Sequence, residues 1–594
     1  MSPKLPGLAT LVIAALSLLA AAVACGEARD GFEPPPAPFD FLDAGTGECP
    51  FQCSLDGRSV TRSCTGEVVE TCRADLACGA AKCQDPCAAA AADKSSNGCE
   101  FLFTSPVPFR EAADSCYAVF VVNASTHPAE ISLGRQGEAL DISRAMFQTV
   151  SGDATLIPHT GTVAPGESVI LFVSGPDPER PVSGDYHMPC PSGVVPAVLS
   201  GLASERSEIG SAFHLTSNQP VTLVAMYPFG GAKSYIPTAS LLLPVVTWAK
   251  EQLLVSPWEA TTVATPNTQI VASEDDTDVT IVPTRDLQDG PGLEGVPANV
   301  PATYRLAKGQ YLQLVQFEEL SGTVVSSNKP TTVFAGHTCV TIPTSSSACD
   351  TLWQQLPAFE QWGSEYVGIG PRSRYGDEHE PMPYRIAAAK DGTRLEYDPA
   401  IPAGAPTELS AGEVATFPAG TGDAFVVRSQ DAEHPIYLAA YMTSARGGYH
   451  APPRETLNDV WGDPEFVNVI PTGHYLSSYS FYADPTFAET SLVVVRAKSH
   501  GVFKDVWLEC AGNLTDFRPV GTRGDYEFTR VDLTRGRGPG QAFGDKTCLS
   551  GVHRMRSEGP FTATVWGWDR WASYAYPGGM AHRTLVTSPL VVVQ

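Results

Sequence analysis

Basic side chains are scarce in this sequence. Its 594 residues include 39 Lys and Arg against 65 Asp and Glu, which gives a net charge of −26. Such a surface repels phosphate backbones, so the composition argues against nucleic acid as a partner and favours solubility outside the cell. Long apolar runs are also missing after residue 24. The longest, Leu241 to Trp248, contains a proline and falls short of the ~18 residues that a membrane-spanning helix needs.

The first 24 residues are the exception to this shortage of apolar runs. Lys4 is their only charged residue, and a long apolar stretch follows it. The small residues Ala22-Val23-Ala24 directly precede Cys25, and this pattern is similar to a bacterial lipobox. The resemblance implies a signal peptide over residues 1–24, a lipid on Cys25 and a mature chain anchored outside the cytoplasm. An ordinary secretory peptide cut near Ala24 and an uncleaved anchor are the alternatives.

The residues after Cys25 predict where the anchored chain lies. Gly26 is not the aspartate that retains many lipoproteins at the inner membrane, so the resemblance implies the outer membrane or cell surface. Residues 25–48 contain Glu33-Pro34-Pro35-Pro36-Ala37-Pro38. Consecutive prolines favour extended polyproline II, and the sequence therefore predicts a stiff spacer between the membrane and the body of the protein.

The cysteines predict disulfides. There are 15, and a lipid on Cys25 leaves an even number, which suits an oxidising compartment. Eight lie in a segment over residues 49–100 that has little core of its own: Cys49, Cys53, Cys64, Cys72, Cys78, Cys83, Cys87 and Cys99. The other six predict three local pairs: Cys116 with Cys190, Cys339 with Cys349, and Cys510 with Cys548. Zinc is the alternative, but the eight include no Cys-x-x-Cys spacing and no histidine lies among them.

Helix-forming patterns are rare as well. The 50 prolines and 53 glycines would interrupt long helices repeatedly. From Phe101 onward, β-branched and aromatic runs such as Tyr117–Val122 and Val221–Tyr227 alternate with Gly, Pro, Asn and Asp. This texture is typical of consecutive strands, so the sequence predicts an all-β fold.

Two short patterns recur along the chain. In the first, a serine and polar residues precede a proline, which predicts a hairpin turn followed by a strand. Its copies lie in residues 216–227, 326–336, 428–441 and 556–568. In the second, a glycine predicts a turn before a strand. Its copies are Ala164-Pro165-Gly166, Ala307-Lys308-Gly309 and Ser410-Ala411-Gly412.

These repeats predict four β modules of about six strands each, over residues 101–240, 241–350, 351–455 and 456–594. Tandem sandwich-like modules are favoured because the predicted cysteine pairs are local to each module. Radial packing of the repeats, as in a β-propeller, is the alternative.

Catalytic motifs are absent: the sequence has no G-x-S-x-G, H-E-x-x-H, Walker loop or G-x-G-x-x-G after a strand. His337 and His379 are interpreted as surface histidines. No cofactor or metal is predicted, and calcium is the alternative because two acidic groups offer oxygen ligands. They are Glu274, Asp275, Asp276 and Asp278, and Asp484 with Glu489.

An aromatic cluster is the remaining candidate for a binding site. Trp566, Trp568 and Trp571 lie close together, followed by Tyr574 and Tyr576. The cluster would suit a platform that stacks against a sugar. The alternative is a core position, because Trp566 and Trp568 fall on one face of a strand.

Several dispersed segments resemble the N-terminal domain family of IgG Fc-binding protein, in the form found in myxobacterial lipoproteins. They are Ser115–Asn123, Ala212–Ser217, Ser327–Pro330, Gly462–Pro471 and Phe481–Thr490. The resemblance covers residues 49 to 594 and implies a large extracellular β domain. It implies no catalytic residues, and it does not imply that this chain binds antibody.

The sequence therefore predicts a surface-anchored, non-enzymatic lipoprotein that binds a protein or glycan partner through its β modules. A secreted hydrolase of polysaccharide or peptide is one alternative. A structural protein of the cell envelope is the other.

Overall fold

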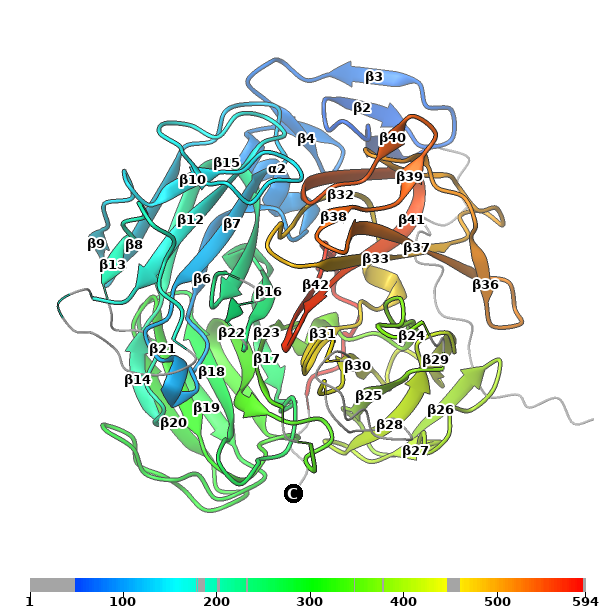
Figure 1. Ribbon diagram of the computed structural model, residues 1–594. Coiled ribbons are helices and arrows are strands. Elements are labelled where there is room, and N and C mark those ends of the chain that lie inside the picture. The colour runs from blue at the N-terminus through cyan, green and yellow to red at the C-terminus, as the bar shows by residue number, and fades with distance from the viewer. Residues whose placement is uncertain are drawn as a thin grey trace, which may run out of the picture. The chain divides into compact units, whose positions relative to one another are not determined.

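The computed structural model describes residues 49–177, 179, 187–199, 203–230, 233–234, 236–346, 348–376, 379–445 and 460–590 (Figure 1). Strands dominate its regular structure, so the predicted all-β fold class is confirmed. The described part has one α-helix, α2 (Pro86–Asp93), and none of its helices is long and apolar enough to cross a membrane. Cys25, the predicted signal peptide and the predicted spacer over 25–48 lie outside the described residues.

The chain forms four successive units, and corresponding strands of the units pair in the same way. Unit 1 (98–242) contains β6 (Gly98–Phe103), β7 (Tyr117–Asn123), β8 (Ile131–Arg135), β12 (Ser168–Gly175), β15 (Phe213–Tyr227) and β16 (Thr238–Leu242). Unit 2 (249–356) contains β17 (Ala249–Leu253), β18 (Pro266–Ala272), β19 (Thr277–Val282), β20 (Ala302–Leu306), β21 (Gln310–Val315), β22 (Val324–Val340) and β23 (Asp350–Leu356).

Units 3 and 4 repeat this order. Unit 3 (365–468) contains β24 (Glu365–Gly368), β25 (Pro381–Ala388), β26 (Thr393–Asp398), β28 (Val414–Gly420), β29 (Phe425–Ser429), β30 (Ile436–Met442) and β31 (Glu465–Asn468). Unit 4 (476–577) contains β32 (Leu476–Ala483), β33 (Glu489–Ala497), β34 (Val506–Leu508), β37 (Tyr526–Arg535), β41 (Gly551–Asp569) and β42 (Ala572–Pro577). Shorter strands such as β10 (Met146–Gln148), β14 (Glu208–Ser211) and β36 (Arg518–Val520) extend the sheet edges.

Each unit is a module of two layers. Unit 3 shows this most simply, because β24, β29, β26 and β27 (Glu408–Leu409) form one sheet and β28, β25, β30 and β31 form the other. Aromatic rings fill the space between the sheets: Tyr384 of β25 and Phe417 of β28 lie 5.0 and 5.8 Å from Phe425 of β29, centroid to centroid. The units are therefore sandwich-like, as the sequence predicts.

In the other three units one long strand belongs to both layers. The first half of β15 pairs with β6 and β8, and its second half pairs with β7 and β16. The strands β22 and β41 divide in the same way.

The repeated Ser-to-Pro motif lies at the point of division, as in Ser217–Pro220 of β15. The predicted hairpin turn there is wrong: the chain bends and continues in the same direction into the second sheet. Proline, which lacks an N–H, fits where ladder hydrogen bonds are interrupted.

The second repeated motif forms the predicted turn. Gly166, Gly309 and Gly412 have φ angles of 76°, 73° and 74°, in the left-handed region that L side chains rarely adopt. Each turn leads directly into the strand that follows it, β12, β21 or β28.

The last strands of the four units meet at the centre (Figure 1). There β16 packs against β23 and β42, and β31 packs against the same two strands. The modules are therefore arranged radially, as the propeller alternative implies, although each one keeps two layers. Units 1 and 4 are neighbours in this arrangement, and Phe120 of β7 stacks on Tyr482 of β32 with centroids 4.5 Å apart.

A buried amide joins these four central strands. Gln354 of β23 has no exposed surface, and its Nε2 lies 2.7 Å from the carbonyl of Ala239, 2.9 Å from that of Phe466 and 3.0 Å from that of Ala575. These carbonyls belong to β16, β31 and β42. One side chain of unit 2 therefore contacts the backbone of each of the other units.

A buried carboxyl group reinforces the same centre. Glu465 of β31 accepts a hydrogen bond from the backbone N–H of Phe466 at 2.9 Å and lies 3.3 Å from the Thr238 hydroxyl of β16. Burial raises the pKa of Glu465 well above its usual value. Asp350 and Asp463 lie close by, and burial raises their pKa values as well, to about 7 for Asp463.

The segment after β42, residues 578–590, crosses several units and is called the C-terminal strap. Its residue Ala581 forms a β-bridge with Ser95, just before unit 1, and donates its N–H to the carbonyl of His474 between units 3 and 4. Farther along, Leu585 donates its N–H to the carbonyl of Glu360, between units 2 and 3. The strap thus forms hydrogen bonds with the segments that connect one module to the next.

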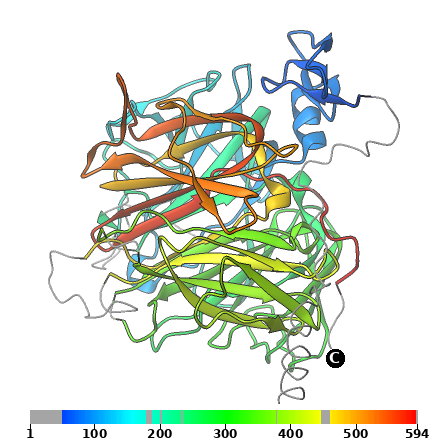
Figure 2. The same ribbon diagram turned by 90° about the vertical axis from the view of Figure 1, so that its right-hand side faces the viewer.

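Short strands and disulfides hold the cysteine-rich segment, which Figure 2 shows in blue at the periphery. Its strands are β1 (Phe51–Cys53), β2 (Ser59–Arg62), β3 (Val68–Thr71), β4 (Ala77–Gly79) and β5 (Lys82–Gln84). Its disulfides are Cys49–Cys64, Cys53–Cys78, Cys72–Cys83 and Cys87–Cys99. Three further disulfides lie within single units: Cys116–Cys190, Cys339–Cys349 and Cys510–Cys548.

Replacing the central amide tests its role. Gln354→Ala removes the donor shared by three buried carbonyls, and we expect the free energy of unfolding to fall by about 1–3 kcal/mol. Gln288→Ala, at an exposed position, is the matched control and is expected to change little. Urea or thermal midpoints of both variants measure the difference, and equal midpoints would contradict the central role of Gln354.

Candidate functional site

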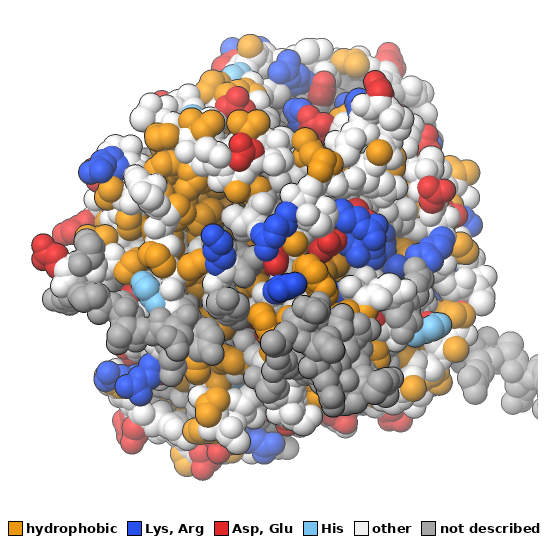
Figure 3. Space-filling view, viewed as in Figure 1, with side chains coloured by type: hydrophobic (Ala, Val, Ile, Leu, Met, Phe, Trp, Pro, Cys, Tyr) orange, Lys and Arg blue, Asp and Glu red, His pale blue; other side chains and the backbone are white. Residues whose placement is uncertain are grey.

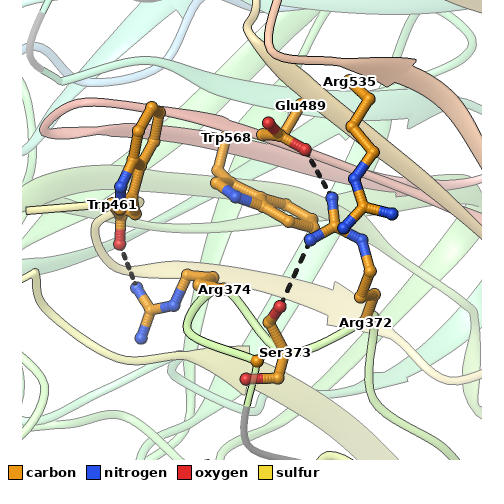
Figure 4. A pocket seen from close by; sticks show the side chains of 8 residues that line it. Arg372, Ser373, Arg374, Trp461, Glu489, Arg535 and Trp568 are labelled. Atoms are coloured by element: carbon orange, nitrogen blue, oxygen red, sulfur yellow. Dashed lines mark hydrogen bonds and ion pairs between the residues drawn. The ribbon is translucent and has the colours of Figure 1, made fainter. Parts of the chain in front are cut away.

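A cavity of about 370 Å³ opens where unit 3 borders unit 4 (Figure 4). It is called the Arg-Trp cavity, and its lining consists of Arg372, Ser373, Arg374, Gly376, Trp461, Glu489, Arg535 and Trp568. Its volume lies within the range of about 300–1,000 Å³ that is typical of small-molecule sites.

The lining residues come from strand ends and the loops beside them. The loop between β24 and β25 supplies residues 372–376, and Trp461 precedes β31. Glu489 begins β33, Arg535 ends β37, and Trp568 lies near the end of β41. Because β33 is hydrogen-bonded to both β37 and β41, the unit 4 contributions have fixed positions relative to one another.

Arg372 joins the two units across the cavity. Its Nη2 lies 2.5 Å from Glu489 Oε2 and its Nε lies 2.8 Å from Asp532 Oδ1, while its guanidinium lies 4.9 Å from the centre of the Trp568 ring. Two carboxylates and an aromatic face therefore hold this guanidinium in one orientation.

Arg374 holds the other side of the cavity. The Nε of Arg374 lies 2.6 Å from Glu380 Oε1, and both side chains are almost fully buried. Its Nη1 donates to the carbonyls of Thr443 and Trp461, each at 2.9 Å. The buried ion pair thus fixes the backbone of Trp461 beside the cavity.

Arg535 differs from the other two arginines because it is mostly exposed. Its side chain retains 61% of its accessible surface, and its Nη1 lies 2.9 Å from Asp532 Oδ2. Among the described residues, Asp532 is its partner, and its Nε and Nη2 make no further hydrogen bond. Arg535 is therefore the most exposed arginine of the cavity, and its Nε and Nη2 donors face a ligand with the least competition from the protein.

The predicted tryptophan platform is only partly assembled. Trp568 lines the cavity, but Arg372 covers its ring, and the residue is 1% exposed. Trp566 is equally buried, which matches the alternative of a core position. Trp571 is half-buried, and the lining of the Arg-Trp cavity includes neither Trp566 nor Trp571.

Sequence reasoning missed the other residues of the cavity, except for Glu489. Trp461 comes directly before the Gly462–Pro471 segment that carries part of the family resemblance. The arginines occur as Arg372-Ser373-Arg374 and as Arg535-Gly536-Arg537, two similar triplets. This repeated Arg-x-Arg spacing, in a chain poor in basic residues, is the sequence signal that points to these arginines.

The two acidic groups of the calcium alternative have other partners. Asp276 and Asp278, at the turn between β18 and β19, lie 2.8 and 3.4 Å from Arg305. Asp484 is buried, which raises its pKa to about 6, and its Oδ1 accepts the N–H of Thr486. Glu489 pairs with Arg372 in the cavity. Among the described residues, no group of three or more His, Cys, Asp or Glu side chains is arranged to hold a metal ion.

The two histidines differ in environment. His379 is exposed, with 81% of its side-chain surface accessible. The surface interpretation is wrong for His337, which is fully buried because β22 is flanked by β18 and β23. Burial lowers the pKa of His337 to about 3, so the ring is neutral and its Nε2 lies 3.1 Å from the carbonyl of Glu259.

Unit 4 differs from the rest of the chain because its charges nearly balance. Residues 476–577 include twelve Lys and Arg against eleven Asp and Glu, a net charge of +1 in a chain with a net charge of −26. Figure 3 shows Lys and Arg side chains gathered where unit 4 borders unit 3. Basic side chains at this border reduce the repulsion that the acidic chain exerts on an anion.

A family model described as IgGFc binding protein matches residues 238–567. The matched range starts at the first residue of β16 and ends within β41, so it covers more than half of the chain. None of the curated proteins matches the chain.

The buried pair Arg374–Glu380 is expected to be essential for the local structure. In Glu380→Gln the Arg374 charge stays buried without its counter-ion, and loss of one partner of a buried pair costs about 3–5 kcal/mol. Glu509→Gln is the matched control, because its partner Arg554 is 51% exposed and such pairs contribute about 0–1 kcal/mol. Denaturant unfolding of both variants provides the measurement, and equal losses would contradict the assignment.

Proposed function

The chain belongs to the IgGFc binding protein family, and from this membership we propose that it is a non-enzymatic binding protein that acts outside the cytoplasm. Its partner is a protein or a glycan. Membership in the family does not assign antibody as that partner, since ligand choice depends on the residues of the site rather than on the fold.

The observation that best supports a binding role is the fixed geometry of the Arg-Trp cavity. Arg372 and Arg374 are held by Glu489, Asp532 and Glu380 before any ligand arrives. A site whose polar groups are already in position loses little conformational entropy when it binds. The cavity also lies at the ends of strands, where loops extend from a rigid scaffold.

Seven disulfides support an oxidising location for this activity. We extend the proposal to an anchor: a lipid on Cys25 holds the protein at the outer membrane or cell surface. The residues Ala22-Val23-Ala24 before Cys25 support this, as does the proline-rich spacer that follows.

Binding is tested with soluble protein that lacks residues 1–25. We expect saturable binding to at least one member of a panel of whole cells, extracted matrix polysaccharide and cell-surface proteins. The reduced and denatured protein is the control, since it keeps the charge and loses the cavity. Equal binding by both forms, or binding to no member of the panel, would refute the proposal.

Anchoring is tested separately by Cys25→Ser. A cysteine that carries lipid partitions the wild-type protein into the detergent phase of a Triton X-114 extract, and the serine variant is expected in the aqueous phase. Cys99→Ser, which removes another cysteine, is the control and should still partition with detergent. Wild-type protein in the aqueous phase would disprove the anchor.

A further inference from the structure

We propose that the Arg-Trp cavity binds a carboxylated sugar residue, whose carboxylate pairs with Arg535, whose ring lies against Trp461 and whose hydroxyl donates to Glu489. This inference rests on the proposed function and names the chemical class of its ligand.

The available donors favour a single carboxylate. Arg372 and Arg374 are occupied by Glu489, Asp532 and Glu380 and by backbone carbonyls, so they position the site and leave little to bind a ligand. Arg535 has one partner among the described residues and keeps the N–H groups of Nε and Nη2. One guanidinium with two donors matches the two oxygens of a carboxylate.

A phosphate or sulfate group is a poorer match. These anions carry three or more oxygens and are usually surrounded by several free donors, such as helix N-termini, clusters of backbone N–H groups or multiple arginines. Among the arginines of the described lining, Arg535 is the most exposed, at 61% against 24% for Arg372 and 2% for Arg374. Glu489 also lies in the same cavity and would repel the additional charge of a phosphate.

Glu489 gives the cavity a hydrogen-bond acceptor, which favours a ligand rich in hydroxyl groups. Its Oε2 pairs with Arg372 at 2.5 Å, and its Oε1 accepts the N–H of Gly536 at 2.8 Å. Each carboxylate oxygen accepts more than one hydrogen bond, so both remain able to receive a hydroxyl. The side chain is 15% exposed, and its orientation is fixed by these two contacts.

The aromatic part of the cavity suits a pyranose ring. Trp461 is half-buried, and its carbonyl is held by Arg374 at 2.9 Å and by the Tyr375 hydroxyl at 3.2 Å. Figure 4 shows Trp461 at one end of the cavity, Arg535 at the other and Trp568 between them. A flat indole offers apolar area to the C–H face of a sugar, while the polar groups at the opposite end bind its substituents.

The experiment measures calorimetric binding of four soluble probes to protein lacking residues 1–25. Trigalacturonic acid represents a polysaccharide source and sialyllactose a glycoprotein source, and galactotriose and lactose are the neutral counterparts. We expect at least one acidic sugar to bind and its neutral counterpart to bind at least tenfold more weakly, because a hydrogen-bonded charge contributes about 1.5–3 kcal/mol. The acidic sugar that binds identifies the source.

Arg535→Gln is the decisive variant. We expect it to weaken binding of the acidic sugar by about tenfold or more and to leave the neutral sugar unchanged. Arg305→Gln is the matched control, because Arg305 is 63% exposed and also pairs with aspartate, but lies outside the cavity. Both side chains lie on the surface, so both variants are expected to keep the wild-type thermal midpoint.

Trp461→Phe and Trp461→Ala test the stacking step. Phenylalanine retains a flat ring and is expected to keep most of the affinity, and alanine is expected to lose it. Equal effects of Arg535→Gln and Arg305→Gln would overturn the proposal, as would equal binding of acidic and neutral sugars. Binding to the cell and protein panel without binding to any acidic sugar overturns this inference alone. Absence of binding to both sets refutes the proposed function as well.

Discussion

The contact of one buried amide with three backbone carbonyls is the constraint on which the rest of the structure depends. Gln354 contributes this amide, and the carbonyls belong to the last strands of the other three units. A buried polar group that loses its hydrogen-bond partner costs about 1–3 kcal/mol of stability. The four modules therefore share one centre. This centre positions the modules relative to one another, and the border between two neighbouring modules is called a seam.

The seam between units 3 and 4 shows how this arrangement produces a site. It is polar: besides Arg372 with Glu489, the carboxylate of Asp398 in unit 3 accepts the N–H and hydroxyl of Thr522 in unit 4. The Arg-Trp cavity lies along this polar border, and its lining comes from residues that are far apart in the sequence.

Much of the fold could be predicted from the sequence, because its signals are local. Glycine in a recurring turn, as at Gly166, and alternating apolar residues both depend on near neighbours. The Ser-to-Pro motif does not distinguish a bend within a strand from a hairpin, because both use the same residues and differ only in which strands pair. Trp566 and Trp568 share a strand face by periodicity, but the neighbouring unit decides what covers it. The pairing of Arg372 with Asp532 spans 160 residues, a distance at which local patterns carry no information.

The C-terminal strap has a consequence for how the molecule reaches its final form. Met580 donates its N–H to the hydroxyl of Ser96, a contact that joins residues 484 positions apart. The radial arrangement of the four units is therefore complete only after the C-terminal residues have been synthesised. Until then β42 is missing and β16 stays uncovered on that side. Contacts between residues so far apart in the sequence form slowly. A chain threaded across a membrane from its amino terminus would spend this interval with apolar strand edges open to neighbours, so its yield should depend on chaperones that shield them.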